Sequence, residues 1–456
     1  MTVSTSSEGG PCRLDPWTLS VSLFGVYLVT HAGGFADQGI GAALTFAVLV
    51  LGGLVVVFPR YGWLFALAIG VHVIELVEKQ PIQSNHMFMA QVLALGIGVA
   101  LVGRMIAERR VSVDLELWYR SFAPLGRCML LVMYFWGTLH KVNEDFLEAT
   151  TSCAIALWTT LGLPDVLAHN ARIHEATMWG TLVLETIAIL CLLVPRFRQV
   201  GILLGIGFHG MLGFSSWGQY IAFSCLSIAL HSFFLPAETM QRWRATALGR
   251  EISGAGGSLV RRVGIALLAV FALLVLPVEL LWALFVLGAL AFAAAFGAES
   301  REPSSGPWLI SPNPAMTVLA VAFLLNGALP YLGTKTGQTL TMFSNLQTEG
   351  GETNHYLLPV VPVFDQQLRL AEIVEANAAA FEDWRDGGYV LVEDHLLDFL
   401  DRYPWVEITY RVGDEVIHHS AETPAPRLAE LPPRWVRDYM VFKPAVVGRP
   451  RACDGY

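Results

Sequence analysis

Apolar segments long enough to cross a lipid bilayer recur along most of this 456-residue chain. A membrane-spanning helix needs about 20 predominantly apolar residues. The candidate segments are 17–34, 40–58, 62–77, 86–106, 122–139, 176–194, 199–214, 219–235 and 315–332. A further run, 264–298, would be about 52 Å long as one helix, so we expect a hairpin hinged near Pro277, with a single span as the alternative. The sequence therefore predicts an all-α polytopic membrane protein with about 9–11 transmembrane helices.

Composition supports the same class of protein. Hydrophobic residues make up 54% of the chain and charged residues only 15%, whereas a soluble globular protein has roughly 25% charged residues. This composition excludes a water-soluble enzyme and a disordered chain. The formal net charge of −9 leaves no basic surface for a nucleic acid.

Charge divides the chain into an apolar body and an acidic end. Residues 333–456 contain 11 Lys and Arg against 19 Asp and Glu, a net charge of −8, and the first 332 residues contain the other 18 and 19, a net charge of −1. The predicted organisation is the following: an N-terminal tail 1–16, a transmembrane domain 17–298, a loop 299–314, a last transmembrane helix 315–332 and an acidic domain 333–456.

The acidic domain shows both helical and strand periodicity, so we expect a small α+β fold. Residues 366–385 have apolar side chains at helical spacing, which predicts a helix. Residues 405–419 alternate apolar and polar side chains around the Gly413-Asp414 pair, which is typical of a β-hairpin.

Basic residues in the loops predict the orientation in the membrane. Alternate loops on one side carry Arg13, Arg60, Arg104, Arg109, Arg110, Arg120, Arg196, Arg198, Arg242, Arg244, Arg250, Arg261 and Arg262. The other side carries Lys79, Lys141 and Arg172. Cytoplasmic loops are rich in Lys and Arg, so the N-terminus is expected to be cytoplasmic in the cell membrane. The acidic domain is extracytoplasmic if 264–298 is a hairpin and cytoplasmic if it is one span. Whether Cys153 and Cys453 form a disulfide stays open.

Ser84-Asn85-His86 opens the fourth apolar segment, and two interpretations apply. Ser or Asn there can cap the helix, with His at the membrane interface. Alternatively, Asn85 and His86 are elements of a functional site, because polar groups at membrane depth are costly and need a reason.

Lys141 follows the fifth apolar segment, in the sequence LHKVNEDFL, and it also has two interpretations. A lysine at a helix end commonly extends its amine to the headgroups. A lysine that is instead buried beside an apolar wall loses basicity and can act as a general base. The sequence does not decide whether Lys141 is buried.

A third polar pair lies within the next two apolar segments. Glu185 and His209 would lie at membrane depth, and we expect them to belong to a buried polar network. The sequence contains no spacing of ligands typical of a metal site, so no metal is expected.

Together these clusters resemble one family. An Asn-His pair opens a span, a Lys-x-Asn-x-Asp-Phe element at 141–146 follows the next span, and a Phe-His pair lies in a later one. This order is similar to that of the vitamin K-dependent gamma-glutamyl carboxylases and the bacterial horizontally transferred transmembrane (HTTM) domain proteins. The resemblance covers about 60–240 and extends more weakly to 315–355 and to WVEITYRVGDE in the acidic domain.

The resemblance implies an integral membrane enzyme that uses a reduced naphthoquinone (vitamin K or menaquinol), oxygen and carbon dioxide. It would carboxylate a glutamate of a protein or peptide on the extracytoplasmic side, with epoxide formation. By this resemblance Lys141 is the base, with Asn85 and His86 as catalytic partners. His209, His140 and Met342 would line the quinone site, close to membrane lipid. The sequence departs from the animal carboxylases at His140, where they have a second lysine, and at Asn143, where they have an aspartate.

A second class of function is also consistent with the sequence. The acidic domain is much smaller than the lumenal part with which the carboxylases bind their substrate. The alternative is therefore a non-catalytic scaffold that binds a quinone or lipid, or a transporter.

Overall fold

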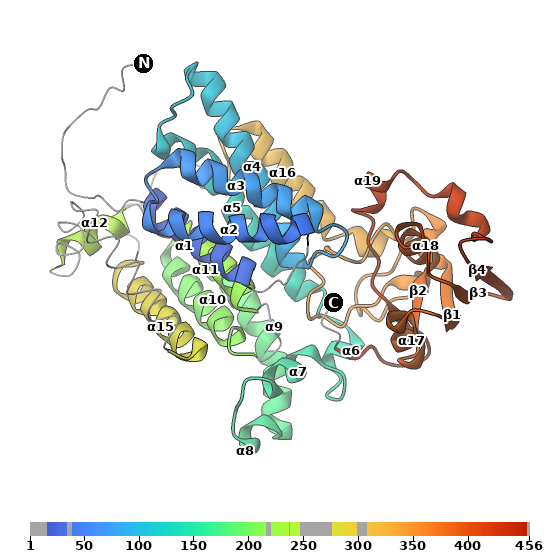
Figure 1. The fold of residues 1–456 in the computed structure, drawn as a ribbon. Helices are drawn as coiled ribbons and strands as arrows, with labels where there is room; N and C mark the ends of the chain where they lie inside the picture. Colours follow the sequence, from blue (N-terminus) through green and yellow to red (C-terminus); the bar gives the residue numbers. More distant parts are fainter. Residues whose placement is uncertain are drawn as a thin grey trace. The chain divides into compact units, whose positions relative to one another are not determined.

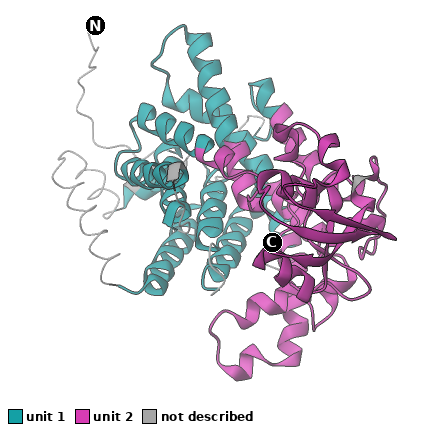
Figure 2. Ribbon diagram, turned by 45° about the vertical axis from the view of Figure 1, so that its right-hand side comes forward, with its two compact units in different colours: residues 1–74, 94–130, 187–317 teal, residues 75–93, 131–186, 318–456 magenta. Residues whose placement is uncertain are grey.

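The computed structural model describes residues 16–33, 39–215, 220–236, 238–246, 276–298 and 308–453. The predicted N-terminal tail and most of the predicted loop 299–314 lie outside these residues. The chain divides into two compact units (Figure 2). Unit 1 comprises residues 1–74, 94–130 and 187–317, and unit 2 comprises 75–93, 131–186 and 318–456.

The described residues are mostly helical (Figure 1), which confirms the helical fold class and a membrane protein in its coarse form. Four of their helices are long and apolar enough to cross a membrane: α4 (Asn85–Glu108), α5 (Leu115–Leu139), α9 (Ala171–Leu193) and α15 (Val278–Phe296). Shorter apolar helices cover Gly41–Val57, Tyr220–Ser232 and Pro314–Asn326. The number of spans, about 9–11, stays a prediction.

The predicted hairpin at 264–298 is described only in its second half. Helix α15 begins directly after Pro277, the expected hinge, because a proline lacks the N–H group that a helix interior needs. Residues 264–275 lie outside the described part of the chain. The choice between one span and two therefore stays open.

Unit 1 packs its helices closely through glycines. Helix α1 (Pro16–Gly33) crosses α2 (Gly39–Val57) where Gly25 meets Gly52. A Cβ atom on Gly25 would lie 3.0 Å from the carbonyl oxygen of Gly52, and a Cβ atom on Gly52 would lie 3.1 Å from that of Gly25. Small residues of this kind let apolar helices approach until their backbones touch. Unit 1 also contains α10 (Arg198–Leu212), α11 (Tyr220–Ser232) and α12 (Glu238–Ala245).

Unit 2 contains one end each of α4, α5 and α9 and a C-terminal antiparallel sheet. The strand order is β4-β3-β1-β2-β5. The strands are β1 (Leu370–Ala376), β2 (Tyr389–Val392), β3 (Ile408–Val412), β4 (Glu415–His419) and β5 (Ala445–Val446). Helices α17 (Ala379–Asp386) and α18 (Glu393–Arg402) complete its core with Phe381, Leu396 and Leu400. The predicted α+β fold and the hairpin at 405–419 are confirmed.

The prediction of one helix over 366–385 is wrong in its first half. Residues 370–376 form β1, the central strand, and only 379–386 form a helix. In β1 the side chains of Ala371 and Ile373 enter the core, and β2 and β3 pair with its two edges. Two ladders of backbone hydrogen bonds outweigh the weak helical preference of this short sequence.

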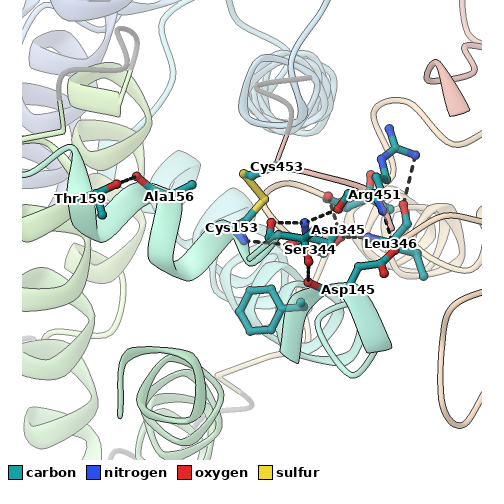
Figure 3. The surroundings of a disulfide bond; sticks show 12 residues. Asp145, Cys153, Ala156, Thr159, Ser344, Asn345, Leu346, Arg451 and Cys453 are labelled. Atoms are coloured by element: carbon teal, nitrogen blue, oxygen red, sulfur yellow. Dashed lines mark hydrogen bonds between the residues drawn. A yellow bond between two sulfur atoms is a disulfide. The ribbon is translucent and has the colours of Figure 1, made fainter. Parts of the chain in front are cut away.

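A disulfide joins Cys453 to Cys153, the first residue of α7 (Cys153–Thr159), and closes a loop of 300 residues (Figure 3). The side chain of Asn345 joins the same two segments through hydrogen bonds. Its Oδ1 accepts a hydrogen bond from the backbone of Cys153 at 2.9 Å, and its Nδ2 donates to the carbonyl of Arg451 at 2.9 Å. The carboxylate of Asp145 accepts from the backbone N–H of Arg451 at 2.9 Å. The C-terminal segment is therefore fastened to the segment that follows α5.

We expect the change Cys453→Ser to lower the free energy of unfolding by about 2–5 kcal/mol, because a cross-link over so long a loop restricts the unfolded chain. Chemical denaturation in detergent, with and without reductant, measures this loss. The matched control is Cys191→Ser, which replaces a free, half-buried thiol and should change little. Equal stability of Cys453→Ser and wild type would contradict the structural role of the disulfide.

Candidate functional site

A buried ion pair lies at the end of α5. The amine of Lys141 lies 2.7 Å from Oε1 and 2.8 Å from Oε2 of Glu185 on α9. Each side chain is only 7% exposed. Thr138 adds a third contact, because its hydroxyl donates to Oε2 of Glu185 at 3.2 Å. The interpretation of Lys141 as a lysine extended to the headgroups is therefore wrong.

The local backbone explains why Lys141 turns inward. Helix α5 ends at Leu139, and the N–H groups of Lys141 and Val142 bond to the carbonyls of Thr138 and Leu139 in a tight turn. After this turn the lysine side chain folds back along the helix. Its Nζ atom lies beside Gly137, 3.8 Å from the position that a Cβ atom would occupy there, which is ordinary van der Waals distance.

His140 occupies the other face of the same turn. Its ring stacks on Trp136, with centroids 5.1 Å apart. One ring nitrogen lies 3.3 Å from the carbonyl of Thr339, so that nitrogen carries the proton, and the other accepts from the hydroxyl of Tyr331 at 3.0 Å. Both ring nitrogens are therefore engaged by the protein. His140 positions the loop that contains Thr339, and a direct bond to a ligand would have to replace one of these contacts.

That loop, residues 336–345, has an unusual backbone. Gln338, Leu340, Phe343 and Asn345 all have positive φ angles, between 52° and 65°. Non-glycine residues seldom adopt this region, and a bulky side chain there carries a conformational cost of the order of 1–3 kcal/mol. Such strain persists only where neighbouring groups enforce it, and it is concentrated at functional sites.

Amide side chains hold the strained loop in place. Asn85, the first residue of α4, accepts a hydrogen bond from the backbone N–H of Leu340 at 2.6 Å. Asn143 donates to the carbonyl of Ser344 at 2.5 Å and also caps α6 (Glu144–Leu147), because its Oδ1 accepts from the N–H of Phe146 at 2.8 Å. Asn326, at the end of α16 (Pro314–Asn326), donates to the carbonyl of Gln338 at 2.8 Å. The side chain of Asn85 thus helps to fix the position of the loop.

The structure brings most of the predicted site residues into unit 2. His86 is buried beside Asn85, and its Nδ1 lies 2.8 Å from the hydroxyl of Ser84. Met342 is half-buried within the strained loop. Asn85 and His140 come from distant parts of the sequence and both contact the loop that contains Met342, and His86 and Lys141 are their neighbours in the sequence.

His209 belongs to unit 1. It lies on α10, is buried, and packs edge-to-face against Phe223 with ring centroids 4.9 Å apart. Glu185 was expected to share a polar network with His209. The hydrogen bonds of Glu185 go instead to Lys141 and Thr138.

Lys335 is a candidate that the sequence reasoning missed. It precedes the strained loop and is 5% exposed, with its amine 4.7 Å from the centroid of the Phe88 ring, one turn after Asn85. Burial lowers the pKa of Lys335 to about 7, because an apolar environment disfavours the charged amine. Nothing in the sequence distinguishes this lysine from others that follow a span, so only the fold could reveal it.

His355 connects the site to the segment that follows. Its Nε2 donates to the carbonyl of Leu139 at 2.8 Å, and its Nδ1 accepts from the N–H groups of Leu357 and Leu358 at 3.0 and 2.9 Å. Burial lowers the pKa of His355. This bonding pattern requires the neutral ring, because Nδ1 acts as an acceptor.

No family model, curated protein or solved structure matches this chain. The amine of Lys141 and the carboxylate of Glu185 lie side by side and almost completely buried, and both are groups of the kind that take part in proton transfer.

We expect Lys141→Met to lower the free energy of unfolding by about 3–5 kcal/mol, because it leaves the Glu185 carboxylate buried without its ammonium. The double change Lys141→Met with Glu185→Met should recover most of that loss, because it removes both charges. A double-mutant cycle of denaturation in detergent measures the coupling. Additive losses in the double variant would contradict a buried ion pair.

Proposed function

We propose that this protein is a membrane enzyme of the vitamin K-dependent carboxylase type. It would couple the oxygenation of a reduced naphthoquinone to the carboxylation of glutamate. The observation that carries the proposal is the buried Lys141–Glu185 pair at the end of a membrane-length helix. Burying an ionised pair costs more desolvation energy than burying two apolar side chains, so a pair at membrane depth points to a functional role. The motif resemblance independently singles out Lys141.

The residues of the site would have the following roles toward such a ligand. Lys141 and Glu185 would face the hydroxyl that must lose its proton, and Glu185 would receive that proton. Met342, in the strained loop, and the ring of Trp136, which stacks on His140 and is 8% exposed, would offer apolar surface to the naphthoquinone. When bound, a reduced naphthoquinone with oxygen would supply the strong base that removes the gamma proton of glutamate, and it would leave as its epoxide.

The positions of Asn85 and His86 fit supporting roles. Asn85 fixes the strained loop through Leu340, so it would set the position of Met342 relative to the ion pair. His86, oriented by Ser84, is buried next to it. Both would act on the geometry of the site, and His86 is the one whose ring could also exchange a proton.

The orientation in the membrane is part of the proposal. Disulfides form and persist outside the reducing cytoplasm. The Cys153–Cys453 bond therefore supports an extracytoplasmic location for the C-terminal region, with the substrate glutamate on that side. The loop charges point the same way if 264–298 is a hairpin.

The test is epoxide formation by the purified protein in detergent, supplied with reduced vitamin K or menaquinol, oxygen, bicarbonate and a glutamate-containing peptide. We expect epoxide and a mass gain of carbon dioxide on the peptide. Lys141→Ala and Glu185→Gln should each lose activity at least a hundredfold, because the proton of the ligand hydroxyl loses its acceptor pair.

Lys79→Ala is the matched control. Lys79 also pairs with a buried carboxylate, since its Nζ lies 2.7 Å from Oε1 of Glu75. The substitution Lys79→Ala should leave turnover unchanged. Size-exclusion profiles and melting curves distinguish lost chemistry from lost folding. Full epoxide formation by folded Lys141→Ala, or binding of either quinol without any product, would overturn the enzyme proposal and favour a binding scaffold.

A further inference from the structure

A nine-residue apolar segment lies exposed immediately after the candidate site. Residues 356–364 read YLLPVVPVF and contain no charged side chain. Five of its side chains expose half or more of their surface: Tyr356 (59%), Leu357 (67%), Val361 (60%), Val363 (59%) and Phe364 (50%). Single exposed apolar residues are normal on protein surfaces, whereas a continuous run of this kind marks an interaction surface.

The segment adopts neither helix nor strand, so its exposure does not follow from an amphipathic element with a polar face. Pro359 and Pro362 remove two backbone donors and keep the chain extended. Charged residues lie on both sides of the segment. Glu352 before it and Asp365 after it are both exposed acids.

Backbone hydrogen bonds fix where the segment lies. The N–H of Tyr356 donates to the carbonyl of Val142, three residues after the end of α5, at 3.1 Å. The N–H groups of Val361 and Val363 donate to the carbonyls of Tyr331 and Leu332 at 2.8 and 2.9 Å. Tyr331 and Leu332 belong to the short turn Leu329–Leu332 that follows α16.

These contacts join the segment to the ends of two apolar helices. Helix α5 is long and apolar enough to cross a bilayer, and α16 is a shorter apolar helix. A segment bonded to the ends of both helices lies at the depth where hydrocarbon gives way to headgroups. The segment begins with Tyr356, a residue type that is enriched at membrane interfaces.

We propose that residues 356–364 insert into the adjacent leaflet of the bilayer and bind lipid acyl chains with their exposed side chains. The occupant is lipid because the segment continues the apolar surface of the two helices to which it is bonded and has no charge with which to select a polar partner. The acids that flank it, Glu352 and Asp365, would remain at headgroup level.

Insertion has a consequence for the candidate site. His355 precedes the segment and bonds to Leu139 at the end of α5, two residues before Lys141. A ligand dissolved in the leaflet would therefore meet the apolar segment next to the Lys141 turn. This consequence rests on the proposed function, whereas the insertion itself does not depend on it.

The test is spin labelling of the full chain in lipid nanodiscs. Val361→Cys, and in a second variant Leu357→Cys, are made after Cys128, Cys191 and Cys225 are replaced by Ala. Collision of each nitroxide with oxygen, which dissolves in hydrocarbon, is compared with collision with a water-soluble nickel chelate. Val416→Cys is the control, because Val416 is also 60% exposed but lies on the β3–β4 hairpin.

We expect labels at 361 and 357 to collide with oxygen several times more readily than with the nickel chelate, and the label at 416 to show the reverse. Labels at 361 and 357 that behave like the label at 416 would show a water-exposed segment and overturn the proposal. Labels protected from both reagents would show a second copy or another protein on the segment, which would also overturn it. Neither outcome depends on quinol turnover.

Discussion

The Lys141–Glu185 ion pair is the interaction around which the site is organised. Two opposite charges in an apolar environment must lie close together, because either one alone would be prohibitively costly. The requirement fixes the end of α5 against α9 and directs the turn 139–142 inward. It also places an amine and a carboxylate side by side with little exposure, and the proposed function relies on this pair.

The strained loop is the second constraint, and it depends on amide side chains. Asn85, Asn143 and Asn326 each contact a different point of the loop, and Asn345 bonds outward to Cys153 and Arg451. Four of the eight residues from 338 to 345 have positive φ angles. This backbone conformation persists because the hydrogen bonds from the amide side chains offset its conformational cost. The disulfide fastens the same region from outside, so the C-terminal segment and the loop support each other.

The apolar helices, the acidic α+β end and the hairpin could be predicted from the sequence, because each shows its pattern of apolar and polar side chains within a single segment. The sequence singled out Asn85 and Lys141, but it could not show that Lys141 is buried, because its partner lies 44 residues away on another helix. Strand β1 was assigned to a helix because its neighbours in the sheet come later in the chain. Lys335 escaped notice because its burial by Phe88 is a tertiary contact.

In the proposed function the ion pair takes up the proton of a bound quinol, with Glu185 as the acceptor. Infrared difference spectroscopy of the protein with and without reduced vitamin K, under nitrogen so that no turnover occurs, tests this directly. We expect a new carboxylic-acid band on binding, shifted by isotopic labelling of glutamate and absent in Glu185→Gln. Binding of the quinol with no carboxylic-acid band from Glu185 would show that Glu185 is not the proton acceptor.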